Sequence, residues 1–402
     1  MKCAFVGATP FYAKNGVATY LRRLSSCYDY FKLHDCELIG VFCGDGVYSA
    51  ATDFTDNASK DLTSNKQLSF RGVLTRQQKD WIKSVLSNSS IGSKIALYFS
   101  HIRYAKRAIR YLSKHIEQAD VFVFNDPFTL NEYINNYSTS KCKTCIVTHD
   151  NGEFGKMLKE SYPKLSSDYI DQLLSKCLSY VDCIIEVGKN SHIRFCELYP
   201  HLAYKAVHIK TGIPSVEIER HYKSDGMIKL INVGTLCSRK NQANLIRAIA
   251  SSVNKQHFRL TLVGGGPDFD LCQDLVSRYD LSTSITLTGP TSEVPRYLSD
   301  SDVYISVSLD EGLPIAMIEA MSCGLPLITS RAGSCPDLIE KNGYIFEGFE
   351  VESICTALDW LYANRNDLRE MGNNSTLLYE SNYTLSSMCN SYIELFNKLV
   401  EL

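Results

Sequence analysis

The chain has 402 residues, a formal net charge of −2 and 45% hydrophobic residues. This length is typical of two or three globular domains, and the composition is that of an ordinary globular protein. A nearly neutral chain has no overall positive field to attract nucleic acid, so we exclude general nucleic-acid binding. Any basic surface for a partner must be local.

Targeting signals and cysteine framework patterns are missing from the sequence. The apolar run in Met1–Gly7 is too short for a secretory signal, and no stretch approaches the roughly 18 apolar residues of a membrane span. The 15 cysteines are scattered, and the single CxxC pair, Cys142 and Cys145, has no second ligand pair at zinc spacing. We expect a cytoplasmic protein with reduced thiols and no metal site.

Short apolar runs alternate with amphipathic segments along the whole chain. We expect strands in the first half at Cys3–Val6, Leu38–Phe42, Val121–Phe124, Thr144–Thr148 and Cys183–Val187. In the second half we expect strands at Lys229–Val233, Leu260–Val263, Ser284–Leu287, Val303–Ser306 and Pro326–Thr329, and helices at Asn241–Val253, Asp268–Tyr279 and Glu352–Ala363. This alternation predicts an α/β protein with two parallel sheets, each covered by helices on both faces.

The domain boundaries follow from a polar stretch between the two halves, which is bracketed by glycine and proline. We expect a first domain at 1–214, a linker at 215–227, a second domain at 228–384, and a C-terminal helix at 385–402 that packs back on the first domain. The polar, weakly patterned region Ala51–Ser93 is expected to be a mobile insertion on the first domain.

The segment Asp310–Gly324 follows an expected strand and has the signals of a loop and a helix. Pro314 suits the first helical turn and Gly324 suits its end. The helix N-terminus would then lie at the carboxyl edge of the sheet, where it attracts an anion such as a diphosphate. Glu311 and Glu319 flank this start, and a hydroxyl-rich ligand would satisfy both carboxylates. Taken alone, Glu319 is more simply a solvated or lysine-paired side chain.

This segment resembles the E-x7-E motif of glycosyltransferase family 4, including its EGLP and EAMSCGLP surroundings. The resemblance implies the GT-B fold, in which two Rossmann-like domains face each other across a cleft that holds the active site. It implies that Glu311 binds hydroxyls of the donor sugar and that Glu319 binds the ribose hydroxyls. Gly312 and Leu313 would offer backbone N–H groups to the sugar.

Two loops of the second half also resemble this family. In Val233–Asn241, Lys240 aligns with the phosphate-binding lysine, with Arg239 beside it, whereas Thr235 stands where the family often has arginine. Without this context Lys240 would be read as a solvated lysine at a helix start. Gly265 lies in a strand-end glycine turn that the family uses near its ligand. The alternative, a dinucleotide fingerprint, is disfavoured because its last glycine position is Phe269.

In the first half the resemblance rests on two strand ends. Asn15 and Gly16 begin a helix as the family's N-terminal GG-V motif does, and Gly16 would present its N–H to the donor phosphate. His149 follows a strand at the place of a family histidine near the donor sugar, which implies a hydrogen bond to that sugar; the alternative is a capping or core histidine.

The implied activity is retaining transfer of a sugar from a UDP- or GDP-sugar to a hydroxyl of a glycan acceptor. We expect this acceptor to be linked to a lipid and the pathway to be bacterial surface polysaccharide assembly. Lys240 and helix N-termini would stabilise the departing diphosphate without a metal ion, and His149, Glu311 and Lys240 are the expected catalytic residues. Two alternatives stay open: a sugar-nucleotide epimerase of the same fold, and a glycan-binding homologue without catalysis, which Thr235 favours.

Lys94–His115 combines six basic residues with interleaved aromatic residues and contains no acidic residue. This pattern is typical of an amphipathic helix that lies on an anionic membrane surface. The alternative is a solvated basic face over a packed aromatic face. We expect peripheral association with the inner face of the plasma membrane through this segment.

Overall fold

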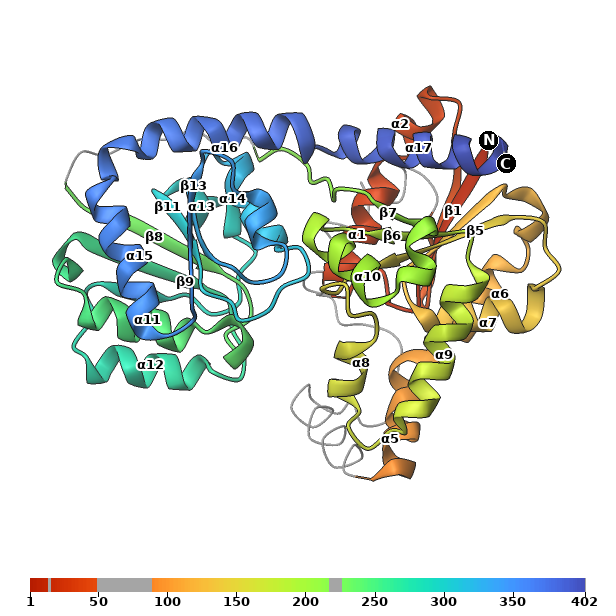
Figure 1. Cartoon of the computed structure of the whole chain (residues 1–402), viewed down its shortest axis with the longest axis horizontal. Helices are drawn as coiled ribbons and strands as arrows, with labels where there is room; N and C mark the ends of the chain where they lie inside the picture. The colour runs from red at the N-terminus through yellow and green to blue at the C-terminus, as the bar shows by residue number, and fades with distance from the viewer. Residues whose placement is uncertain (14–15, 49–88, 217–225, 402) are drawn as a thin grey trace, which may run out of the picture. The chain divides into compact units, whose positions relative to one another are not determined.

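A computed structural model of the chain describes residues 1–13, 16–48, 89–216 and 226–401. Nearly all of the expected insertion Ala51–Ser93, most of the expected linker and Asn15 lie outside the described residues. The chain divides into two compact units (Figure 1). The first contains Met1–Val187, His192–Ile209 and Met388–Leu402, and the second contains Gly188–Ser191 and Lys210–Ser387. The C-terminal residues thus belong to the first unit, and the second begins five residues before the expected linker.

The first unit contains a seven-stranded sheet in the order β3-β2-β1-β4-β5-β6-β7. Its strands are β1 Lys2–Val6, β2 Glu37–Cys43, β3 Gly46–Tyr48, β4 Val121–Phe124, β5 Lys143–Thr148, β6 Cys183–Glu186 and β7 Ala206–His208. All neighbours are parallel except β2 and β3, which are antiparallel. The sheet is thus parallel as expected, with one added antiparallel edge strand where a two-residue turn at Gly44 and Asp45 reverses the chain.

Helices lie on both faces of this sheet, while α5 and α8 extend away from it (Figure 1). The α-helices of this part of the chain are α1 Gly16–Ser26, α2 Tyr28–Leu33, α5 Ser90–Leu97, α6 Arg103–Leu112, α7 Pro127–Tyr137, α8 Lys156–Ser161, α9 Ser167–Tyr180, α10 Lys189–Leu198 and α17 Leu385–Glu401. Helix α17 packs on β1, where the Tyr392 ring meets the Phe5 ring edge to face at 5.3 Å between centroids. The hydroxyl of Tyr392 is hydrogen-bonded to that of Tyr20 in α1. In the parts of the chain that are described, no helix combines the length and the apolar character of a membrane span.

The basic segment forms two α-helices rather than one. Helix α5 ends at Leu97, a π-helical turn covers Tyr98–Ile102, and α6 ends at Leu112, before the expected limit at His115. Helix α6 has the expected two faces: its alanines, Ile109 and Leu112 are buried, and its four basic residues are exposed or half-buried.

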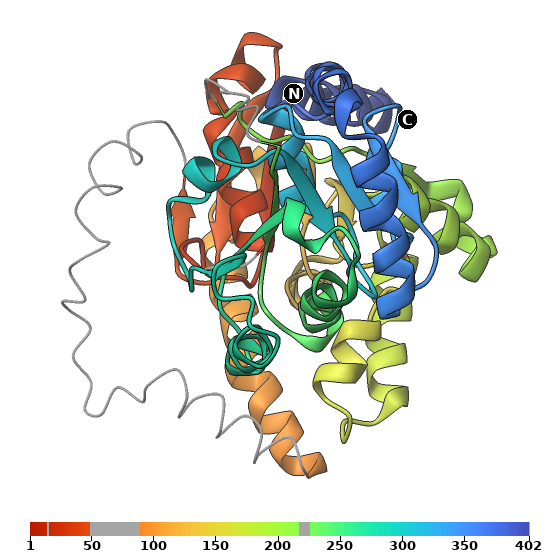
Figure 2. The same cartoon turned by 90° about the vertical axis from the view of Figure 1, so that its left-hand side faces the viewer.

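The second unit contains a six-stranded, fully parallel sheet in the order β10-β9-β8-β11-β12-β13. Its strands are β8 Ile228–Val233, β9 Phe258–Val263, β10 Ile285–Leu287, β11 Val303–Ser306, β12 Leu327–Ser330 and β13 Gly343–Phe346. Its α-helices are α11 Gln242–Ser251, α12 Phe269–Arg278, α13 Val294–Ser299, α14 Ile315–Ser322, α15 Val351–Ala363 and α16 Leu368–Asn382. Helices flank these strands in both views (Figures 1 and 2).

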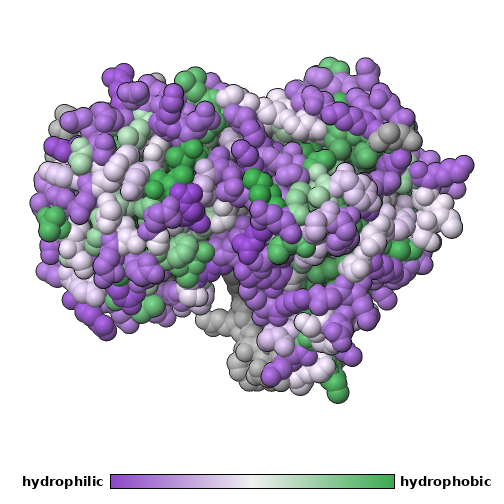
Figure 3. Space-filling model, in the orientation of Figure 1, coloured by the Kyte–Doolittle hydropathy of each residue, from purple (hydrophilic) through white to green (hydrophobic). Residues whose placement is uncertain are grey.

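Two separate cores explain this layering. One face of the second sheet packs on α11, α12 and α15, and the other packs on α13, α14 and α16. Because both faces are covered, the central strands are apolar on both sides, which is the pattern that identified them in the sequence. Hydrophilic side chains dominate the visible face of each unit (Figure 3). Each unit is therefore a doubly covered, Rossmann-like α/β layer structure.

Candidate functional site

The carboxyl ends of the neighbouring strands β8 and β11 bring three predicted residues together. The loop after β8 contains Arg239 and Lys240, and the loop after β11 contains Glu311. Lys240 Nζ forms an ion pair with Glu311 Oε1, and Arg239 Nη1 lies 3.3 Å from the same oxygen. Arg239 also donates to the Asp310 carbonyl at 2.6 Å. The two loops thus carry opposite charges that meet at one point.

A backbone hydrogen bond and local backbone conformation fix the position of these two loops. The N–H of Leu309 donates to the Arg239 carbonyl at 2.8 Å. Asn241 adopts a left-handed conformation, with φ of 60°, which ends the short 3-10 turn and starts α11. Gly234 lies beneath the lysine, since a Cβ added there would be 3.5 Å from Lys240 Cε. The lysine is therefore positioned by its loop and not free in solvent.

Burial and charge act on Glu311 in opposite directions. The residue is 8% exposed, and burial alone would raise its pKa. The charges of Lys240 and Arg239, with hydrogen bonds from Lys240 and Ser308, outweigh burial and hold the pKa below the ordinary value. Glu311 is thus an ionised, largely buried carboxylate, and its Oε1 is contacted by both cations of the neighbouring loop.

Glu319 lies in α14, the helix that directly follows the loop containing Glu311. Helix α14 begins at Ile315, with Pro314 as the residue before it, so the prediction of Pro314 inside the first turn was off by one position. Gly324 ends the helix region with φ of 69°, as expected. The buried phenol of Tyr304 in β11 has a raised pKa because of burial first, and then because of Glu311 and Glu319. Both carboxylates therefore lie within electrostatic reach of the Tyr304 hydroxyl.

The glycine turn containing Gly265 packs against the loop after β8. A Cβ on Gly264 or Gly266 would collide with the backbone of Gly234 or Leu236, and a Cβ on Gly265 would lie 2.9 Å from Pro290. These glycines are needed for loop packing, whatever else they contact. Gly312 and Leu313 are half-buried in the loop after β11.

The sequence interpretation missed the polar support of this region. Gln242 is buried and donates to the Asn232 side chain and to the Thr235 carbonyl, both at 3.2 Å. Asn232 in turn donates to the Ile305 carbonyl at 2.8 Å. These bonds connect β8, its loop and β11. A polar pair inside apolar runs was the available signal, because buried amides need partners.

In the first unit, His149 follows β5 and is positioned by β4. Its Nε2 lies 3.2 Å from Asn125 Oδ1, while the Asn125 amide group donates to the Val6 carbonyl at 3.4 Å. This arrangement assigns the ring proton to Nε2 and leaves Nδ1 as the acceptor. The Tyr20 ring meets the imidazole edge to face at 5.0 Å between centroids. Burial lowers the pKa of His149 to about 4, so the ring is neutral at physiological pH.

Gly16 begins α1, and a Cβ added there would meet nothing within 4 Å. The protein itself therefore does not require glycine at this position.

The Asp126 side chain connects the ends of β1 and β4, since it accepts from Ala8 N at 2.6 Å and from two N–H groups of α7.

Glu186, the last residue of β6, is a titratable group that the sequence interpretation missed. It is 0% exposed, and among the described residues no ion pair or well-aligned hydrogen bond reaches its carboxylate oxygens, although the nearby Thr148 hydroxyl lowers its pKa. Burial raises its pKa to about 8, and the nearby Asp150 adds to this effect. The side chain is therefore a neutral carboxylic acid at physiological pH.

We expect Glu186→Gln to stabilise the protein increasingly as the pH rises. The folded-state pKa is raised, so the wild-type contribution is fully present below pH 4.5, falls as the pH rises toward about 8 and then levels off. Urea unfolding at pH 5.5 and pH 9 measures the difference, with Glu197→Gln on the exposed face of α10 as the control. A variant-to-wild-type difference that does not change between the two pH values would contradict the buried-acid interpretation.

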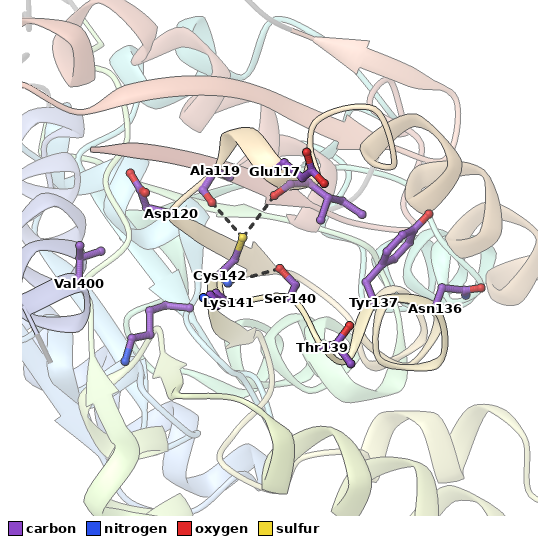
Figure 4. A pocket seen from close by; sticks show the side chains of 12 residues that line it. Glu117, Ala119, Asp120, Asn136, Tyr137, Thr139, Ser140, Lys141, Cys142 and Val400 are labelled. Carbon is purple, nitrogen blue, oxygen red and sulfur yellow. Dashed lines mark hydrogen bonds between the residues drawn. The ribbon is translucent and has the colours of Figure 1, made fainter.

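A hollow of about 590 Å³ lies at the opposite, amino edge of the first sheet, where β4 and β5 begin (Figure 4). Cys142 lies in it, and its thiol donates to the Ala119 carbonyl at 2.9 Å. Cys142 therefore has a local structural role. Because ligands of α/β proteins bind at the carboxyl edges of sheets, we do not place the functional site here. In the described ranges no group of three or more His, Cys, Asp and Glu side chains is arranged to hold a metal ion.

Comparison with solved structures identifies the fold. The structure of Anabaena Alr3699/HepE in complex with UDP aligns with a TM-score of 0.68 at 15% identity, and the alignment covers 99% of this chain and 100% of that one. The chain therefore has the GT-B fold, as the sequence resemblance implied, with two Rossmann-like domains.

Residues 216–377 match the family described as Glycosyl transferases group 1. This match lies within the second unit of the chain. A GDP-mannose-dependent alpha-(1-6)-phosphatidylinositol monomannoside mannosyltransferase of Mycolicibacterium smegmatis is 30% identical over 155 residues, which are 36% of this chain and 41% of the relative. The putative colanic acid biosynthesis glycosyltransferase WcaL of Salmonella typhimurium is 28% identical over 151 residues, covering 35% and 37%. Each match thus spans less than half of the relative's length.

Proposed function

We propose that this protein is a retaining glycosyltransferase that moves a sugar from a nucleotide-diphospho-sugar to a hydroxyl of a glycan acceptor in bacterial polysaccharide biosynthesis. The observation that carries the proposal is the meeting of Lys240, Arg239 and Glu311 at the carboxyl edge of the second sheet. Cations there suit a diphosphate, and an adjacent buried carboxylate suits sugar hydroxyls. The relatives, which are named as glycosyltransferases, support the same class.

The donor roles follow from this chemistry. Lys240 and Arg239 bind the diphosphate, and Glu311 with the N–H groups of Gly312 and Leu313 binds the sugar. Glu319 binds the ribose, while Gly265 and Gly16 let backbone approach the donor. The base is uracil or guanine, since one relative is named for GDP-mannose and one fold neighbour is in complex with UDP. Because Lys240 and Arg239 supply positive charge at the leaving group, we propose a transfer that needs no metal ion.

His149 is the proposed residue of the first unit that hydrogen-bonds the donor sugar. Its neutral imidazole, with Nε2–H held by Asn125, presents Nδ1 as an acceptor. In a retaining transfer the departing diphosphate oxygen can take the proton of the incoming hydroxyl, so no carboxylate nucleophile is needed. The protein then contributes positioning and stabilisation of diphosphate charge.

We expect nucleotide sugars to raise the melting temperature, because a ligand that binds the folded state stabilises it by mass action. A panel of UDP- and GDP-sugars at 1 mM, measured by thermal shift with and without EDTA, identifies the base and the sugar. The matching donor should raise the melting temperature equally in both conditions. If no nucleotide sugar shifts the melting temperature, the donor site proposed here does not exist.

A lipid-linked acceptor and a peripheral position on the cytoplasmic face of the membrane are part of the proposal. Helices α5 and α6 carry exposed basic residues, including Lys94, Lys106 and Arg110. Exposed apolar side chains occur in the same segment, at Ile91 in α5 and at Phe99 in the π-helical turn. A face of this composition combines electrostatic attraction to anionic lipid with apolar insertion.

We expect the protein to sediment with vesicles that contain anionic lipid and not with neutral vesicles, and to lose this binding as salt is raised. Replacing Lys94, Lys106 and Arg110 by glutamine should abolish vesicle binding. Three glutamines at Lys255, Arg278 and Arg369 of the second unit provide a charge-matched control. Equal binding to neutral and anionic vesicles would defeat the electrostatic docking.

A further inference from the structure

The donor site holds a charge pair between two residues that are assigned to different parts of the same ligand. Lys240 Nζ contacts Glu311 Oε1, and the two side chains are only 16% and 9% exposed. A buried pair of this kind is costly to break on one side only, because the remaining charge is left without a partner. A ligand that binds Lys240 therefore removes the lysine from Glu311, and this loss reduces the free energy of binding unless another group of the ligand contacts Glu311.

Resting on the proposed function, we propose that the Lys240–Glu311 pair is exchanged during the reaction cycle and discriminates the intact nucleotide sugar from the nucleoside diphosphate product. The diphosphate forms an ion pair with Lys240, which then leaves Glu311. When the intact donor binds, hydroxyl groups of the sugar donate hydrogen bonds to the Glu311 carboxylate, so Lys240 and Glu311 each keep a partner.

The product lacks this compensation. After the sugar has been transferred, the nucleoside diphosphate still competes for Lys240, but nothing on it reaches the carboxylate of Glu311. The pair re-forms and lowers the affinity for the product. Arg239 contacts the Asp310 carbonyl and Glu311 through Nη1, so its other N–H groups can serve the diphosphate. Nη1 at 3.3 Å offsets only part of the charge that Glu311 loses when Lys240 leaves.

The shared oxygen of Glu311 supports the exchange. Lys240 and Arg239 both contact Oε1, so the ionised carboxylate can accept from a new donor when Lys240 leaves. A sugar hydroxyl donates along a defined direction and fits such an acceptor. The backbone bond from Leu309 to Arg239 keeps the two loops together, so the exchange requires only side-chain movement.

The test compares the affinity for the nucleoside diphosphate with the affinity for the nucleotide sugar. Isothermal titration calorimetry measures the dissociation constants of UDP, GDP and the nucleotide sugar of the matching base, for wild type and for Glu311→Gln. We expect the nucleoside diphosphate to bind Glu311→Gln about tenfold tighter than wild type, a typical size for coupled sites. The preference of wild type for the nucleotide sugar over the diphosphate should disappear in the variant. Glu347→Gln, in an exposed pair of the same unit, should change neither affinity.

The possible failures are separable. If neither UDP, GDP nor any nucleotide sugar binds wild type, the proposed function is wrong. If UDP or GDP binds wild type and binds Glu311→Gln equally or more weakly, the exchange is wrong while the function stands. Should Glu311→Gln fail to fold, crystal structures of wild type with and without the nucleoside diphosphate decide: the exchange requires Lys240 Nζ to leave Glu311 when the diphosphate is bound, and an unchanged pair overturns it.

Discussion

Replacing Glu311 by glutamine should reduce sugar transfer about 100-fold or more while leaving the fold intact. The amide keeps the shape of the side chain but removes the negative charge that accepts hydrogen bonds from sugar hydroxyls in the transition state. Loss of one such polar contact in a preorganised site costs roughly 10²–10³ in kcat. Release of nucleoside diphosphate with the matching donor and acceptor measures the effect.

Glu347→Gln is the matched control for this variant. Glu347 pairs with Arg331 at 2.6 Å on the surface of the same unit, and its side chain is 72% exposed. The control should retain wild-type transfer. Transfer by Glu311→Gln within threefold of wild type would show that Glu311 does not serve the reaction.

Replacing Lys240 by methionine should lower both transfer and stability. Methionine keeps the apolar stem over Gly234 but removes the charge that stabilises the diphosphate, so we expect a loss of about 100-fold in kcat/KM. It also leaves the buried carboxylate of Glu311 with Arg239 alone, and removing one partner of a buried pair costs about 3 kcal/mol.

The pH dependence of this loss has a defined sign. In wild type the pKa of Glu311 is held low, so its contribution to stability is present above the ordinary pKa of the carboxyl and is lost as the pH falls through the folded-state value. Urea unfolding should therefore show a smaller difference between Lys240→Met and wild type at pH 4 than at pH 7. Arg331→Met, which breaks an exposed pair, should cost under about 1 kcal/mol. A Lys240→Met loss no larger than this control would contradict a buried, coupled pair.

The central strands were predictable because both faces of a parallel sheet are buried. Val121–Phe124 and Val303–Ser306 were expected with the bounds that β4 and β11 have. The missed strands β3, β7 and β13 are all edge strands. Most of their residues are half-buried or exposed, so they lack a continuous apolar run.

Some site residues were predictable from local sequence, and others depend on the fold. Lys240 and Glu311 were found from local motifs, and the structure brings them together from two neighbouring strand ends. The supports of His149 are long-range: Asn125 and Tyr20 come from other elements. Glu186 stands in an apolar strand, and only the fold reveals that its carboxyl is fully buried without a balancing cation in the described structure. A sequence shows which groups carry chemistry, but their partners depend on tertiary contacts.

We propose that the second unit binds the nucleotide sugar. The most direct test is a crystal structure of the protein with the nucleoside diphosphate that raises its melting temperature. The account predicts the diphosphate against Lys240 and Arg239 at the carboxyl edge of β8 and β11, with the ribose hydroxyls at Glu319. A diphosphate bound elsewhere, with Lys240 and Glu319 untouched, would contradict it.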